Sequence, residues 1–137
     1  MDITVNYLAV LVAAIVSFIL GAIWHGPLFG KTWAVARGLT PEQIEAGKKH
    51  MPRYMVIIFL LLVVVAWGLA VLAGYTHLVT LMQGLKLGFI CWLAFAVTTG
   101  LAEAAMVPGA KYTTFYVSMG SWLITFLVSG MIVSYWR

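Results

Sequence analysis

Four long stretches with almost no charged side chains dominate this chain and restrict it to a membrane fold. They cover approximately residues 5–24, 54–74, 81–106 and 112–136. A helix of about 20 residues crosses the roughly 30 Å of bilayer hydrocarbon, and each stretch is long enough to do so. Each stretch is apolar on all sides and lacks the period-2 alternation of a membrane strand. We therefore predict an all-α integral membrane protein, built as a four-transmembrane-helix bundle.

The overall composition supports a membrane protein with a single domain. Hydrophobic residues make up 64% of the chain and charged residues only 9%, against about a quarter charged in soluble domains. A soluble fold would need polar surface residues that this chain does not contain. Residues 1–137 are predicted to form one membrane domain. The first apolar stretch lacks a preceding positive charge and a following cleavage site, so we expect it to stay in the mature protein.

The longest connection, residues 25–53, is predicted to contain a short amphipathic helix. Thr40 is a suitable N-cap, Pro41 suits the first turn, and Gln43 stands three residues after the cap. This pattern predicts a helix over residues 41–49, close to the membrane surface.

Basic residues are distributed unequally between the two ends of the predicted bundle. Connections 25–53 and 107–111 lie on the same face, because two spans separate them. The positive-inside rule places these connections in the cytoplasm and both termini outside. The basic residues do not alternate with aromatic ones, so we expect no nucleic-acid partner. The cytoplasmic face would hold Lys31, Arg37, Lys48, Lys49, Arg53 and Lys111, and the other face Lys86 and Arg137.

Small residues recur at a spacing of four along the spans. Span one carries Ala13, Ser17 and Gly21, and span three carries Gly84 and Gly88. Small side chains let membrane helices approach closely. Since every span carries such a stripe, we expect more contact surface than one bundle uses. Span one is our candidate surface for contact with other chains.

Glu103 is the single acid in a predicted span, and its role has two interpretations. Ionisable groups are costly in a membrane, which favours a functional role in handling ions or protons. Glu103 also lies about one turn from the end of span three, where it could reach the interface or pair with Lys111. Both interpretations stay open at this point.

His25 is a weak candidate for binding a haem, a pigment or a metal. His25, His50 and Glu103 share no recognised metal-ligand spacing, so we expect no metal and no cofactor. The chain also lacks a nucleophile–base pairing, a P-loop and a dinucleotide fingerprint, and we expect no enzymatic activity.

A compact motif follows span one and is predicted to form a structured turn. Pro27 disfavours helix at the preceding residue, and the glycines on both sides permit a sharp change of direction. We expect this turn, from Trp24 through Gly30, to fold back so that Phe29 and Trp33 are buried at the membrane boundary.

The runs at residues 24–33 and 38–40, together with those at 84–88 and 92–99, resemble the signature of a bacterial membrane family. This family is designated domain of unknown function 1761, and the resemblance covers essentially the whole chain. It implies the four-span layout and localisation to the bacterial inner membrane, but no activity, cofactor or catalytic residue. Two positions depart from the family pattern. His25 stands where an aromatic residue is usual, and Glu103 where a neutral polar residue is commoner.

These observations together predict a non-enzymatic small integral membrane protein. It would act through helix–helix association in the lipid bilayer, as a homo-oligomer or as an accessory subunit of a larger membrane complex. The alternative is an oligomeric channel, or a transporter of ions or small solutes, that uses Glu103. Binding of haem, pigment or metal through His25 is the remote alternative.

Overall fold

The computed structural model describes residues 3–137 as a set of helices, with no strand in that range. Four continuous helical segments are long and apolar enough to cross a membrane: Tyr7–Leu28, Met51–Tyr75, Leu81–Met106 and Tyr112–Tyr135. The predicted all-α, four-span architecture is therefore confirmed. The elements in chain order are α1 (Tyr7–Ile23), η1 (Trp24–Leu28), α2 (Gly30–Ala36), α3 (Pro41–Lys48), α4 (Met51–Tyr75), α5 (Leu81–Cys91), η2 (Trp92–Val97), α6 (Thr98–Met106) and α7 (Tyr112–Tyr135).

The boundaries of the elements follow local sequence signals. The short loop helix, α3, starts with the predicted capping box, in which Thr40 and Gln43 each accept a backbone N–H of the other residue. Asn6 caps α1 in a related way, since its side chain accepts the N–H groups of Leu8 and Ala9. Span two begins at Met51, three residues before its predicted start, because Pro52 fits within the first turn of a helix.

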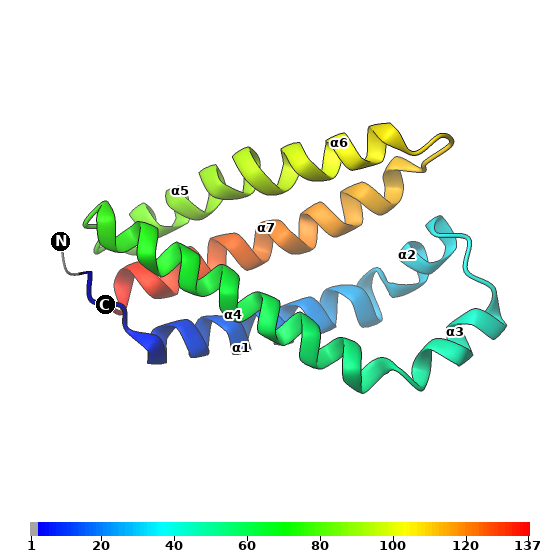
Figure 1. The fold of residues 1–137 in the computed structure, drawn as a ribbon, viewed down its shortest axis with the longest axis horizontal. Coiled ribbons are helices and arrows are strands. Elements are labelled where there is room, and N and C mark those ends of the chain that lie inside the picture. Colours follow the sequence, from blue (N-terminus) through cyan, green and yellow to red (C-terminus); the bar gives the residue numbers. More distant parts are fainter. Residues whose placement is uncertain (1–2) are drawn as a thin grey trace.

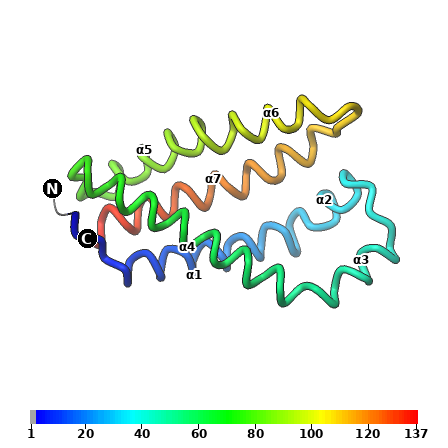
Figure 2. The backbone as a smooth tube through the Cα atoms, viewed as in Figure 1, coloured from blue at the N-terminus to red at the C-terminus, as the bar shows by residue number. Residues whose placement is uncertain are grey.

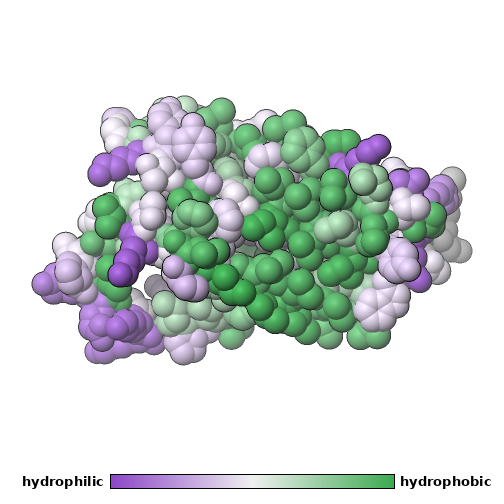
Figure 3. Space-filling model, turned by 180° about the vertical axis from the view of Figure 1, so that it is seen from behind, coloured by the Kyte–Doolittle hydropathy of each residue, from purple (hydrophilic) through white to green (hydrophobic). Residues whose placement is uncertain are grey.

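The spans alternate in direction, so both ends of the described chain lie at the same end of the bundle as the short connection between α4 and α5 (Figure 1). The opposite end carries α2, α3 and the turn between α6 and α7. We call it the loop-one end, and it holds six of the eight basic residues. A band of apolar side chains separates the two more hydrophilic ends (Figure 3). This arrangement fits a multi-pass membrane protein.

Helix α7 is the centre of the bundle and packs against α1, α4 and α5, whereas α4 and α5 barely meet. Figure 2 shows the same relationship, with α7 running between α5 and the pair formed by α1 and α4. The core is lined by small side chains that allow close packing. Ala13, Ala66 and Ser129 are each 0% exposed.

The contact between α5 and α7 depends on glycine. A Cβ atom added at Gly84 would collide with the backbone carbonyl of Gly130, and one added at Gly130 would collide with the carbonyl of Gly84. One turn further along, a Cβ at Gly88 would collide with the carbonyl of Phe126. The two backbones therefore touch directly, as in close crossings of membrane helices.

These contacts change the interpretation of the small-residue stripes. Ala13 and Ser17 are buried inside the chain's own bundle, and Gly84 and Gly88 are covered by α7. Our expectation of surplus stripes on span one is corrected here, because one chain already buries most of this surface. Gly21 differs, since a Cβ added there would meet nothing within 4 Å.

Candidate functional site

Two π-helical segments interrupt the spans and lie on either side of α7. Segment η1 continues α1 towards the loop-one end, and η2 joins α5 to α6. Both segments contact α7 directly or through their flanking helices. Short π-helical insertions are rare and are found frequently at functional sites, so this level of the bundle is the candidate site.

Trp24 is the first residue of η1 and attaches it to α7. Its indole N–H donates a hydrogen bond of 2.8 Å to the backbone carbonyl of Val117. The ring fits because position 120 is a glycine, where an added Cβ would lie 2.6 Å from the Trp24 ring. On its other side, the ring centroid of Trp24 is 4.4 Å from that of Phe29. Trp24 is thus enclosed by α7 and by the turn that follows it.

Trp92 is the first residue of η2 and makes the equivalent bond from another side of α7. Its indole N–H donates to the carbonyl of Met119 over 2.9 Å. Helical residues advance by about 100° each around the axis, so residues two positions apart lie about 200° apart around the helix. Trp24 and Trp92 therefore hold α7 from nearly opposite sides, at one level of the bundle.

The motif after Trp24 is structured, as expected, but it does not fold back: the helix continues through Leu28 as a π-helical turn and resumes in α2 at Gly30 (Figure 1). The N–H of Phe29 donates to the carbonyl of Trp24 over 2.9 Å, which closes the π-helical turn around Pro27. A Cβ added at Gly30 would collide with the carbonyl of His25, so a larger residue does not fit there. Phe29 and Trp33 are half-buried, less than the full burial predicted. The guanidinium of Arg37 covers the Trp33 ring at 4.8 Å.

His25 is exposed and directs its ring edge-on towards Trp33, with the ring centroids 6.3 Å apart. His50 instead lies beside Tyr54, with 6.2 Å between ring centroids. Within residues 3–137, no three side chains of His, Cys, Asp or Glu come close enough to hold a metal ion. The structure therefore does not bring His25, His50 and Glu103 together as a set of metal ligands.

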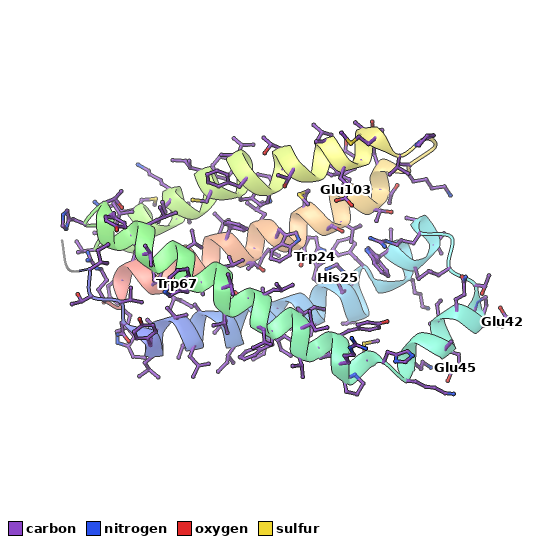
Figure 4. All side chains as sticks on the ribbon, in the orientation of Figure 1. Trp24, His25, Glu42, Glu45, Trp67 and Glu103 are labelled. Atoms are coloured by element: carbon purple, nitrogen blue, oxygen red, sulfur yellow. The ribbon has the colours of Figure 1, made fainter. Side chains whose placement is uncertain are left out.

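Glu103 is exposed on α6, about one turn before that helix ends. In Figure 4, α7 runs between Glu103 on α6 and His25 on η1. The ion pair found among the described residues joins Lys48 and Glu45, and none joins Glu103 to Lys111. The carboxyl group of Glu103 therefore has no ion-pair partner among the described residues, and it lies near the loop-one end of its span.

Several other polar groups of the spans form hydrogen bonds, whereas the buried hydroxyl group of Ser134 has no partner among the described residues. The hydroxyl groups of Ser17 and Ser129 share a buried hydrogen bond of 3.1 Å, which ties α1 to α7. Thr98 and Thr99 donate to carbonyls of the preceding turn of their own helix. These interactions hold helices together and satisfy polar groups in a medium without water.

The roles of Trp24 and Trp92 were missed from the sequence. The sequence pattern placed Trp24 only at the start of the turn and assigned no role to Trp92. One signal was present. An indole N–H within an apolar span needs an acceptor, and a backbone carbonyl of a neighbouring helix is the most abundant one there.

The geometry describes a four-span bundle whose central helix is held by the hydrogen bonds of two tryptophans, by one pair of serines and by contacts at four glycines. No curated protein and no solved structure matches the chain. A family model described as "Protein of unknown function (DUF1761)" matches residues 8–134. The match covers nearly the whole chain and agrees with the resemblance drawn from its motifs, so the chain belongs to this family.

Proposed function

We propose that this protein is a non-enzymatic integral membrane protein that acts by associating with other membrane helices. It would form a homo-oligomer or serve as an accessory subunit of a larger membrane complex. The observation that carries this proposal is the exposure of residues 51–61, the part of α4 before its first buried residue, Leu62; we call it the first half of α4. Only Met55 and Phe59 are half-buried there, and the large apolar residues left exposed are Met51, Tyr54, Val56, Ile57, Ile58, Leu60 and Leu61.

The exposed arc at the start of α4 is broader than the exposed stripe of α1. At about 100° per residue, consecutive exposed positions from Val56 to Ile58 already extend over roughly 200° of the helix circumference. On α1, by contrast, the exposed residues Leu11, Ile15 and Ile19 recur every four positions and form one narrow stripe. The first half of α4 therefore offers surface on several sides, enough for a neighbouring helix as well as for lipid.

Lipid tails are as apolar as these side chains, so association would gain packing energy and not hydrophobic energy. Even a hydrogen-bonded polar pair between membrane helices contributes only about 1 kcal/mol, so stable association through apolar packing needs an extended surface. A half-helix exposed over most of its circumference supplies such a surface.

We place the protein in the bacterial inner membrane with both termini outside. Support comes from the loop-one end, which holds six of the eight Lys and Arg residues and would face the cytoplasm by the positive-inside rule.

The mass of the particle extracted in a mild detergent tests the proposal. We expect a mass above that of one chain, or a co-purifying membrane protein. Ile57→Trp combined with Leu61→Trp should lower this mass, because bulky rings prevent close helix approach. Leu11→Trp combined with Ile15→Trp is the matched control, since it adds the same rings to similarly exposed positions on α1. A wild-type protein that runs as a lone monomer would contradict the proposal.

An oligomeric channel or a transporter of ions or small solutes is the second candidate function. It is favoured by Glu103, an exposed carboxyl group without an ion pair among the described residues. Ion flux in liposomes that is lost in Glu103→Gln, but kept in Glu42→Gln on the loop helix, would support this candidate. The absorbance spectrum of the same purified protein tests the remote alternative, a haem or pigment at His25.

A further inference from the structure

A shallow hollow opens between α2 and the start of α7, at the loop-one end of the bundle. It joins segments that are far apart in the sequence, with α2 on one wall and the residues around the first turn of α7 on the other. Its lining residues are Lys31, Thr32, Val35, Ala36, Lys111 and Thr113.

The lining of the hollow is cationic. Two of its side chains are lysines, two are threonines with hydroxyl groups, and none is acidic. Both lysines are exposed, and the ion pair found within residues 3–137, between Lys48 and Glu45, involves neither of them. The lining of the hollow thus combines two lysines and two threonines with a surface that is mostly apolar.

The level of the hollow relative to the membrane defines the class of anion. Lys31 lies three residues after Leu28, where span one ends, and Lys111 directly precedes Tyr112, where span four begins. Both ammonium groups therefore lie where an apolar span meets the polar headgroup region. Val35 and Ala36 add an apolar wall beside the charges, which suits an amphipathic ligand better than a free ion.

We propose that this hollow binds the phosphate of an anionic phospholipid headgroup. Lys31 and Lys111 supply the positive charge, and the hydroxyl groups of Thr32 and Thr113 supply hydrogen-bond donors. Basic hollows between membrane helices are known sites for anionic headgroups. This inference is independent of helix association and goes beyond the function proposed above.

The test measures lipid binding to the intact protein in a neutral detergent by native mass spectrometry. Phosphatidylglycerol, which is anionic, is titrated in parallel with phosphatidylcholine, which carries no net charge. Each lysine near an anionic headgroup is worth about 1 kcal/mol, or roughly fivefold in affinity. Lys31→Gln with Lys111→Gln should therefore weaken phosphatidylglycerol binding by about tenfold or more. The variant with Lys31→Arg and Lys111→Arg should keep most of the wild-type affinity for phosphatidylglycerol, because arginine retains the positive charge.

The matched control is Lys48→Gln with Lys49→Gln, which removes the same charge from the same end of the bundle. It should leave phosphatidylglycerol binding within about twofold of the wild type, and helix content by circular dichroism should stay unchanged in all variants. Equal weakening by both pairs would overturn the proposal, because binding would then follow overall charge. Equal affinity for the two lipids would also overturn it. So would displacement of the lipid by millimolar inorganic phosphate, since the ligand would then be a small anion.

Discussion

The indole N–H of Trp24 and the backbone carbonyl of Val117 are 93 positions apart in the sequence and joined by a hydrogen bond of 2.8 Å. Val117 belongs to the central helix α7, and Trp92 binds the same helix two residues further along, at Met119. Each bond attaches the first residue of a π-helical segment to α7. The two tryptophans therefore attach the π-helical segments of two spans to α7, which contacts all the other spans.

Trp24→Phe and Trp92→Phe should each lower the free energy of unfolding by about 1 kcal/mol or more. Phenylalanine keeps the six-membered ring but removes the N–H donor together with the rest of the indole, so the hydrogen bond accounts for about 1 kcal/mol of the loss and lost packing adds to it. Trp67→Phe is the control, because the Trp67 side chain lies exposed on α4. Unfolding by sodium dodecyl sulfate in mixed micelles, followed by circular dichroism, measures all three. A Trp67 variant as destabilised as the other two would contradict a specific role.

Gly88→Ala should destabilise the bundle by about 1–3 kcal/mol, as overpacking of a tight contact does. The added methyl group would collide with the carbonyl of Phe126, and backbone cannot move aside as a side chain can. Gly68→Ala is the control, since a Cβ there meets nothing within 4 Å. Alanine favours helix over glycine by up to about 1 kcal/mol, so this control should be neutral or slightly stabilising. The same unfolding assay distinguishes the two outcomes.

Ser17 and Ser129 should show a coupling energy of about 0.6 kcal/mol in a double-mutant cycle, the average for polar pairs between membrane helices. Each Ser→Ala substitution removes one end of the buried bond between α1 and α7. The double variant should then be more stable than the sum of the two single losses implies. Strictly additive losses would mean that the two hydroxyl groups contribute independently.

Gly30→Ala should disturb the turn after span one, whereas Gly26→Ala, four residues earlier, should not. A Cβ at Gly30 collides with the carbonyl of His25, while one at Gly26 meets nothing within 4 Å. We expect a loss of about 1–3 kcal/mol for the first variant and a change below about 0.5 kcal/mol for the second. Thermal melting in detergent compares them directly. Similar melting curves for the wild type and Gly30→Ala would show that the turn tolerates rearrangement.

The features that the sequence predicted are the ones encoded locally. An apolar run of sufficient length defines a span, and Thr40 with Gln43 defines the start of the loop helix whatever the rest of the chain does. Pairings between spans are not local, because every span is apolar on all sides and shows no preferred face. The partner of Gly84 could be identified only once α5 was placed against α7, where Gly130 fills the other side of the contact.

The same reason explains why the candidate site was predicted only in part. The motif around Pro27 predicted an irregularity in the backbone, since proline removes a helix hydrogen bond and glycine permits unusual conformations, but not that the helix continues through it as a π-helical turn. The stripe of Ala13 and Ser17 looked available for another chain, because nothing in the sequence shows that α7 brings Ser129 against it. Small residues mark where helices approach closely, but not whether the neighbour belongs to the same chain.

The orientation in the membrane is the last prediction, and the unequal distribution of basic residues supports it. We expect position 48, on the loop helix, to face the cytoplasm and position 77, between α4 and α5, to face outside. Cys91 is buried and is replaced by alanine first, so that Lys48→Cys and His77→Cys each carry one accessible thiol. A membrane-impermeant maleimide added to intact cells should label the cysteine at position 77 and leave the one at position 48 unlabelled. Lysis before labelling is the control, since both cysteines should then react. Labelling of position 48 alone in intact cells would show that the protein has the opposite orientation.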